Sequence, residues 1–199
     1  MQIPFLPYDK LRPIAGKFLD EYNESGEIPV PIELIIDNRF EIDIVPTPGL
    51  HRGYDIDSYI TSDFSAIHID DYVYESRPAR YRFSLAHEIS HYIIHKDVFA
   101  QLEFSNIQGW KDAVQGIPER EYGLLEFQAN SLAGLILVPG SELETRFDGA
   151  VGTAEAAGIA MDDPSGAAMQ SIEGYLAGQF DVSTAVIHRR LEFDKLIAG

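Results

Sequence analysis

Two segments with helical periodicity constrain the fold of this chain more than any other feature of its sequence. Ala79–His95 follows Pro78, which the first turn of a helix tolerates, and Glu119–Leu137 follows Pro118. Within the second segment, Leu124–Leu137 is apolar almost all round its axis, and Pro139-Gly140 stops the helix. A helix that is apolar on every side is buried in a folded protein, so we expect Leu124–Leu137 to lie in the core.

Weaker patterns predict the other elements. Helical periodicity marks residues 8–24, 32–38, 141–147, 170–178 and 182–196, and alternating apolar and polar residues predict strands at 40–45, 55–61 and 65–70. We interpret Lys96–Pro118 as an irregular connection, which could be a lid, a docking surface or a loop. Asp148–Gly166, rich in Ala, Gly and Asp, is expected to be a flexible surface segment. These elements predict an α+β fold, mostly helical, with a small three-stranded sheet beside the helix at 79–95.

The 199 residues suit one domain, because no repeat or linker divides them. Within it we distinguish an N-terminal part (1–63), a core (64–140) and C-terminal helices (141–199). The chain has no cysteine, which excludes disulfides and thiolate metal sites and leaves His, Asp and Glu as metal ligands.

The charge of the chain bears on its partners and location. It carries 15 basic and 32 acidic residues, a formal charge of −17, and such a surface repels phosphate backbones. We therefore expect no direct nucleic-acid partner. No apolar run reaches the roughly 18 residues of a membrane span, and the N-terminus does not look like a signal peptide, so we expect a cytoplasmic protein without a membrane partner.

The helix predicted at Ala79–His95 carries a candidate metal site, His87-Glu88-Ile89-Ser90-His91. Residues four apart lie on one face of a helix, so the imidazoles of His87 and His91 can reach the same cation. Glu88 then lies beside the metal, where it can act as a general base on water. The alternative is a buried helix whose two histidines satisfy hydrogen bonds in the core.

A third ligand is needed, and His95 does not qualify. Along a continuous helix it lies about 12 Å beyond His87, too far to share a metal. The pattern HExxHxxGxxH is also excluded, because Ile94 and Asp97 occupy its glycine and last histidine positions. We interpret His95 as a helix-end residue that favours the helix dipole.

Glu126 is the better third ligand. It lies on the apolar helix, where a buried carboxylate is costly unless a cation or hydrogen bonds compensate. Asn130, one turn further on, could orient a ligand, most plausibly His87. Alternatively, Glu126 pairs with Arg82 or Arg120. Two imidazoles and one carboxylate suit Zn²⁺ best, although manganese, iron or cobalt could occupy such a site.

Together these residues resemble the ImmA/IrrE-type metallopeptidases. The resemblance spans roughly residues 65–191 and rests on three groups of residues: Arg82-Phe83 with Ala86-His87-Glu88 and His91; Glu126, Ala129-Asn130 and Val138-Pro139; and Phe180, Val182-Ser183 and Arg190-Leu191. The resemblance implies a zincin-like fold, with His87, His91 and Glu126 binding the metal and Glu88 as general base.

Members of that family typically cleave helix-turn-helix repressors. The resemblance therefore implies a zinc-dependent endopeptidase that acts on a regulatory protein, such as a repressor or an antitoxin. The alternative is a zinc-stabilised regulatory protein that binds its partner without cutting it. Tyr74, Tyr122 and His68 are conceivable oxyanion donors, and the sheet edge that holds an extended substrate is expected at Ile67–Ile69.

Overall fold

The structure, a computed structural model, describes residues 3–102, 104, 106–159 and 166–197. In chain order the elements are α1 (Tyr8–Tyr22), α2 (Ile32–Arg39), β1 (Asp43–Thr47), α3 (Leu50–Tyr54), β2 (Ser58–Ile60), β3 (Ala66–Asp70), α4 (Asp71–Ser76), α5 (Pro78–Ile94), α6 (Lys96–Phe99), α7 (Ile107–Gln115), α8 (Glu119–Leu137), α9 (Gly140–Ala156), α10 (Ala167–Phe180) and α11 (Thr184–Phe193). The fold is α+β, mostly helical, with a three-stranded sheet, as predicted.

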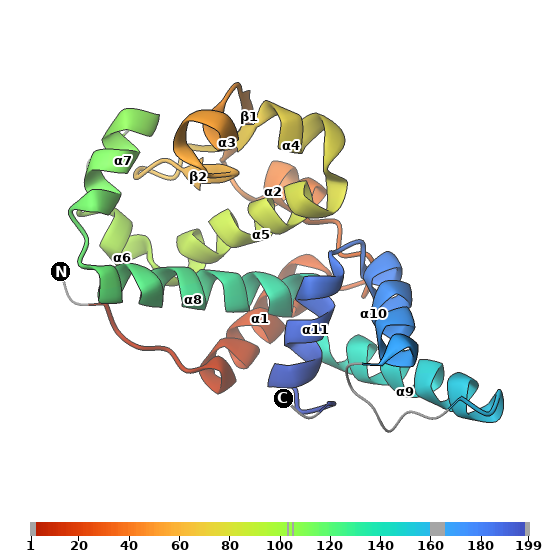
Figure 1. Cartoon of the computed structure of the whole chain (residues 1–199). Coiled ribbons are helices and arrows are strands. Elements are labelled where there is room, and N and C mark those ends of the chain that lie inside the picture. The colour runs from red at the N-terminus through yellow and green to blue at the C-terminus, as the bar shows by residue number, and fades with distance from the viewer. Residues whose placement is uncertain (1–2, 103, 105, 160–165, 198–199) are drawn as a thin grey trace.

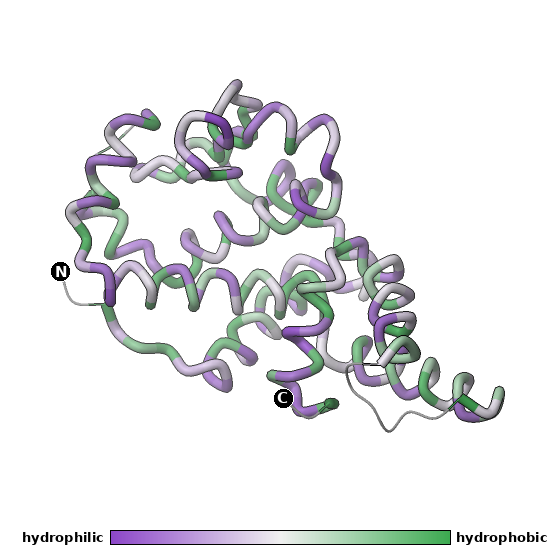
Figure 2. Tube along the Cα trace, in the orientation of Figure 1, coloured by the Kyte–Doolittle hydropathy of each residue, from purple (hydrophilic) through white to green (hydrophobic). Residues whose placement is uncertain are grey.

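The long helices α5 and α8 lie side by side at the centre, with the sheet on one side and α1 on the other (Figure 1). Most helices alternate hydrophilic and hydrophobic residues along their turns (Figure 2), which lets each bury one face. Leu85 and Ile89 of α5 and Leu132 and Ile136 of α8 are fully buried. Burial of such a side chain contributes about 1.5–3 kcal/mol, so this contact is a major source of stability.

The sheet has the order β1-β3-β2, with β1 parallel and β2 antiparallel to β3. Because β3 is the central strand, Ile67–Ile69 is not the sheet edge, and the prediction of a substrate-binding edge there is wrong. Pro46 in β1 is compatible with an edge strand, since proline cannot donate to a ladder. The Asp70 carboxylate at the end of β3 accepts hydrogen bonds from the backbone of His51 and Tyr72, which ties α3 and α4 to the sheet.

Two segments are more helical than the sequence analysis predicted. Lys96–Pro118 contains α6 and α7, and the side chain of Asn106 caps α7 by accepting from the backbone N–H of Gly109 at 2.9 Å. The flexible segment predicted at 148–166 is wrong for residues 148–156, which continue α9; residues 160–165 lie outside the described chain. Alanine favours the helix there, and α9 ends before Gly158, whose φ of 79° is left-handed.

The remaining predicted elements are present with shifted ends. β1 begins at Asp43 rather than Phe40, and β2 is shorter than predicted because α3 and the left-handed Asp55 occupy the residues before it. Among the described residues, no helix is both long and apolar enough to cross a membrane.

The C-terminal helix α11 is fastened to the end of α8 by Arg190. Its buried guanidinium donates to the backbone carbonyls of Gly134 and Val138 and to the Asp194 carboxylate. The Gly134 carbonyl also accepts from the backbone N–H of Val138, whereas the Val138 carbonyl follows the last turn of α8, where helical partners are lacking. Arg190 therefore stabilises the helix that carries Glu126.

Candidate metal centre

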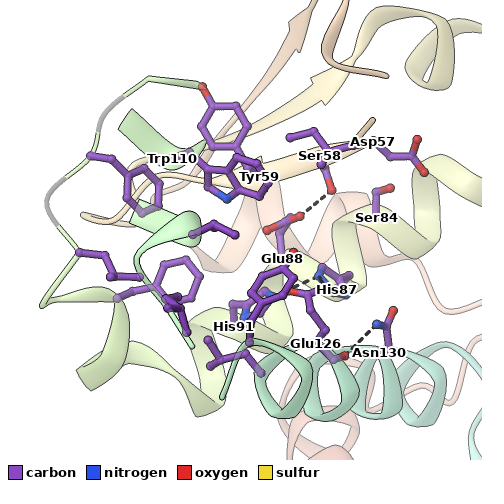
Figure 3. Close-up of a pocket in the computed structure, with 18 of the residues that line it drawn as sticks. Asp57, Ser58, Tyr59, Ser84, His87, Glu88, His91, Trp110, Glu126 and Asn130 are labelled. Atoms are coloured by element: carbon purple, nitrogen blue, oxygen red, sulfur yellow. Dashed lines mark hydrogen bonds and ion pairs between the residues drawn. The ribbon is translucent and has the colours of Figure 1, made fainter. Parts of the chain in front are cut away.

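The structure brings His87, His91 and Glu126 together at the floor of a cavity between α5 and α8 (Figure 3). The Nε2 atoms of the two histidines lie 3.1 Å apart. The Glu126 carboxylate oxygens lie 3.5 Å from His87 Nε2 and 3.7 Å from His91 Nε2. The Glu126 side chain is 32 % exposed, so it is not enclosed in the core as its apolar helix suggested, but opens into the cavity.

This arrangement of donor atoms fits a zinc ion. Bonds of about 2.0–2.2 Å in tetrahedral geometry place ligand atoms about 3.3–3.6 Å apart, close to the three separations observed. Burial lowers the pKa of His91 well below its ordinary value, so its imidazole is neutral, the form that binds a metal. Two imidazoles, one carboxylate and an open cavity above them match the donor set of a catalytic zinc site.

Glu88 lies beside this cluster and is almost fully buried. Its carboxylate accepts a hydrogen bond of 2.5 Å from the Ser58 hydroxyl on β2, and it also accepts from the backbone N–H of Ile60. Burial raises the pKa of the Glu88 carboxyl, while the neighbouring His87 imidazole and these hydrogen bonds oppose the rise. A carboxylate with a raised pKa is a better proton acceptor near neutral pH.

His95 differs from its prediction. It is buried, and its Nδ1 lies 2.9 Å from Nδ1 of His91, while its Nε2 lies 3.1 Å from Oε1 of Gln128. Burial lowers the pKa of His95 to about 4, so it carries no charge that could favour the helix dipole near neutral pH. His95 does lie at the helix end, as the C-cap of α5, but its predicted role toward the helix dipole is wrong because its side chain is buried and uncharged.

Of the other residues that the sequence placed near Glu126, Arg82 has different partners and Asn130 lies close by. Arg82 donates to the backbone carbonyl of Val30 at 2.8 Å and pairs with Asp181, so it does not serve as the partner of Glu126. Asn130 lines the cavity, and its amide donates to the backbone carbonyl of Glu126 at 2.7 Å (Figure 3). Orientation of His87 by Asn130 stays a prediction.

The cavity above the floor has a volume of about 300 Å³. One side is an apolar wall from the α6–α7 segment, formed by Phe99, Leu102, Phe104, Trp110, Val114 and Ile117. The wall is tied to the end of β2, because the Ser62 hydroxyl donates to the backbone carbonyl of Phe104 at 2.8 Å. The segment 96–118 is thus a side of the cavity, and a cavity of this size admits a short extended segment rather than a folded domain.

Of the three conceivable oxyanion donors, the cavity contains Tyr122. Burial raises the pKa of Tyr122, and the nearby carboxylates of Glu126 and Glu88 raise it further, so its hydroxyl stays protonated. His68 instead stacks on Tyr59 and contacts the Thr47 hydroxyl at 2.9 Å. Tyr74 packs edge-on against Tyr81.

Comparison with known proteins identifies the family of this chain. The family model described as "IrrE N-terminal-like domain", Peptidase_M78, matches residues 38–192, which include every residue of the cluster. The chain belongs to the Peptidase_M78 family. None of the curated proteins compared with the sequence matches it.

The fold of this Peptidase_M78 chain is similar to solved structures. One is described as a Mycobacterium tuberculosis transcriptional regulator, with a TM-score of 0.53 and 14 % sequence identity. The match covers 90 % of this chain and 45 % of that protein, so the chain spans less than half the length of the similar structure. At this identity the likeness concerns the fold alone.

Sequence reasoning missed two residues of the Peptidase_M78 site, Ser58 and Gln128. Ser58 precedes the motif by many residues, and no local pattern indicates that β2 lies against Glu88. Gln128 offered a usable signal, since a fully buried amide in the apolar helix requires polar partners.

Proposed function

We propose that this chain is a zinc-dependent endopeptidase that acts in the cytoplasm on a regulatory protein, such as a helix-turn-helix repressor or an antitoxin. The observation that carries the proposal is the triangle of His87, His91 and Glu126 at the floor of an open cavity, with Glu88 beside it. Membership of Peptidase_M78 supports the peptidase chemistry. The description of the similar structure as a transcriptional regulator supports a regulatory setting.

His87, His91 and Glu126 would hold the metal, which when bound supplies a Lewis acid that polarises a carbonyl and makes water more acidic. Glu88 accepts the proton of the attacking water as the new carbon–oxygen bond forms at the peptide carbonyl. Glu88 then passes that proton to the amide nitrogen as the carbon–nitrogen bond breaks. The protonated Tyr122 hydroxyl, which lines the same cavity, would donate to the developing oxyanion.

The strand that would hold an extended substrate is β2. Asp57 and Thr61 exchange backbone hydrogen bonds with β3 at 2.8 and 2.9 Å, and residues in an antiparallel strand alternate in the direction of their backbone groups. Ser58 and Ile60 therefore direct their backbone groups away from β3, to the side where Glu88 lies. The Ile60 N–H donates to Glu88, so an extended peptide would pair with the remaining backbone groups of Ser58 and Ile60 and would pass over the floor of the cavity.

Substitution of Glu88 by Gln tests the chemistry. The Glu88→Gln protein should retain zinc, measured by plasma mass spectrometry, and should cut neither a library of proteome-derived peptides nor purified helix-turn-helix repressors. Glu119→Gln, at the exposed start of α8, is the matched control and should cut as the wild type does.

Two results would contradict the proposal. Cleavage by Glu88→Gln at the wild-type rate would remove Glu88 from the reaction. A zinc-loaded wild type that cuts nothing, but binds a repressor as tightly as Glu88→Gln does, would be a regulatory binding protein instead.

A further inference from the structure

A chain of hydrogen bonds leads from His91 away from the cavity. His91 Nδ1 contacts His95 Nδ1 at 2.9 Å, His95 Nε2 contacts Gln128 Oε1 at 3.1 Å, and Gln128 Nε2 donates to the backbone carbonyl of Pro4 at 3.0 Å. His91 and His95 are at most 4 % exposed, and Gln128 is fully buried. These hydrogen bonds thus join α5, α8 and the segment before α1; those between His91, His95 and Gln128 are buried, and the last one, to the exposed Pro4, is part-buried.

The direction of each hydrogen bond in this series follows from the Pro4 carbonyl at its end. The carbonyl of Pro4 can only accept, so the amide nitrogen of Gln128 faces Pro4 and its oxygen faces His95. That oxygen also only accepts, so His95 carries a proton on Nε2. The hydrogen-bonding neighbours of His95 are a neutral amide and a neutral imidazole, and a buried imidazolium between them would be costly.

A neutral His95 with its proton on Nε2 has an unprotonated Nδ1, which must accept from His91. His91 therefore carries its proton on Nδ1, and the lone pair of its Nε2 is free. That Nε2 is the atom directed at His87 and Glu126. The other tautomer of His91 would place a proton where the metal binds.

We infer that His95 is a positioning residue, which together with Gln128 and the Pro4 carbonyl holds His91 in the tautomer and ring orientation that present Nε2 to a metal. The inference rests on the metal site of the proposed function but not on turnover. Partners of metal-binding histidines typically change metal affinity about 10–100-fold when removed, and an effect of this size is expected here.

The direct test is the tautomer of His91 in the metal-free, ¹⁵N-labelled full-length protein, read from two-bond ¹H–¹⁵N correlations of the imidazole ring. The expected spectrum shows His91 protonated at Nδ1 and His95 protonated at Nε2. A His91 protonated at Nε2 in the wild type would overturn the inference, whatever any variant does.

Zinc affinity, measured by competition with a chelator, supplies the second readout. His95→Phe keeps the volume of the side chain but removes both nitrogens, and should weaken zinc binding about 10–100-fold. His95→Asn places an acceptor oxygen where Nδ1 lay and should restore most of the loss, a rescue that a merely structural role would not give. His68→Phe, a half-buried histidine outside the cluster, should leave the affinity unchanged.

The outcomes separate this inference from the proposed function. Equal zinc affinities for His95→Phe and the wild type would overturn the role of His95 while leaving the peptidase proposal intact. A wild type that binds zinc and shows the expected tautomer, but cuts no peptide, would refute the proposed function and support the inference.

Discussion

The floor of the cavity, formed by α5 and α8, and its apolar wall, formed by the α6–α7 segment, differ in how their side chains are held. On the floor, Glu88 and His91 are buried and bonded to specific partners. On the wall, every residue of α7 keeps some solvent exposure, and Trp110 contacts Tyr59 only through a tilted aromatic pair at 6.2 Å. Hydrogen bonds fix direction whereas apolar contacts do not, so under the proposed function the floor would set the chemistry and the wall would accept varied substrate side chains.

The largest expected effect is on stability and concerns Arg190, which anchors α8, one of the two helices that form the floor. Arg190→Ala removes the two buried hydrogen bonds that link α11 to the end of α8, and the ion pair with Asp194, which keeps Arg12 and Tyr8 as partners. Hydrogen bonds from a charged donor contribute about 1.5–3 kcal/mol each, so we expect the free energy of unfolding to fall by about 3–5 kcal/mol, measured by urea denaturation. The exposed neighbour Arg189 is the control, and Arg189→Ala should change stability by less than about 0.5 kcal/mol. Equal losses in the two variants would show that Arg190 does not anchor α8.

An intermediate effect is expected at the wall. Trp110→Ala removes a half-exposed ring that lines the cavity, so stability should change by less than about 1 kcal/mol. The KM for a cleaved peptide should rise about 10-fold with kcat little changed, because a buried aromatic contact is typically worth more than 1 kcal/mol in binding. Trp110→Phe should recover most of the affinity. A fall in kcat with unchanged KM would place Trp110 in the chemistry of the floor instead.

The smallest expected effect is on stability and concerns His188, which belongs to neither the floor nor the wall of the cavity. The hydrogen bond to Glu173 raises the pKa of His188, which joins α10 to α11. A raised pKa in the folded state means that the stabilisation is complete below the unfolded pKa of about 6.5 and is lost as the pH rises through the folded value. His188→Gln should therefore lower stability at about pH 6 by less than about 1 kcal/mol, since the His188 side chain is 47 % exposed, and should have no effect at about pH 9. A larger difference at the higher pH would contradict this assignment.

The two long helices and the grouping of His87, His91 and Glu126 were predictable because their signals are local. The repeat in Ala79–His95 and the apolar face around Glu126 each lie within one helix, and the two helices pack together because both are apolar. Strand order was not predictable, since the alternation in Ala66–Asp70 does not say whether a strand is central or at an edge. The contacts Ser58–Glu88 and His95–Gln128 depend on which elements become neighbours, which no short segment of sequence records.

The most direct test of the central claim is the metal content of the purified protein, measured by plasma mass spectrometry without chelator. The account predicts about one zinc per chain in the wild type and in Glu119→Gln, and sharply less in His91→Ala and Glu126→Ala. Wild type that takes up no zinc even when zinc is added, or Glu126→Ala that binds as much as the wild type, would contradict a metal centre built from these three residues.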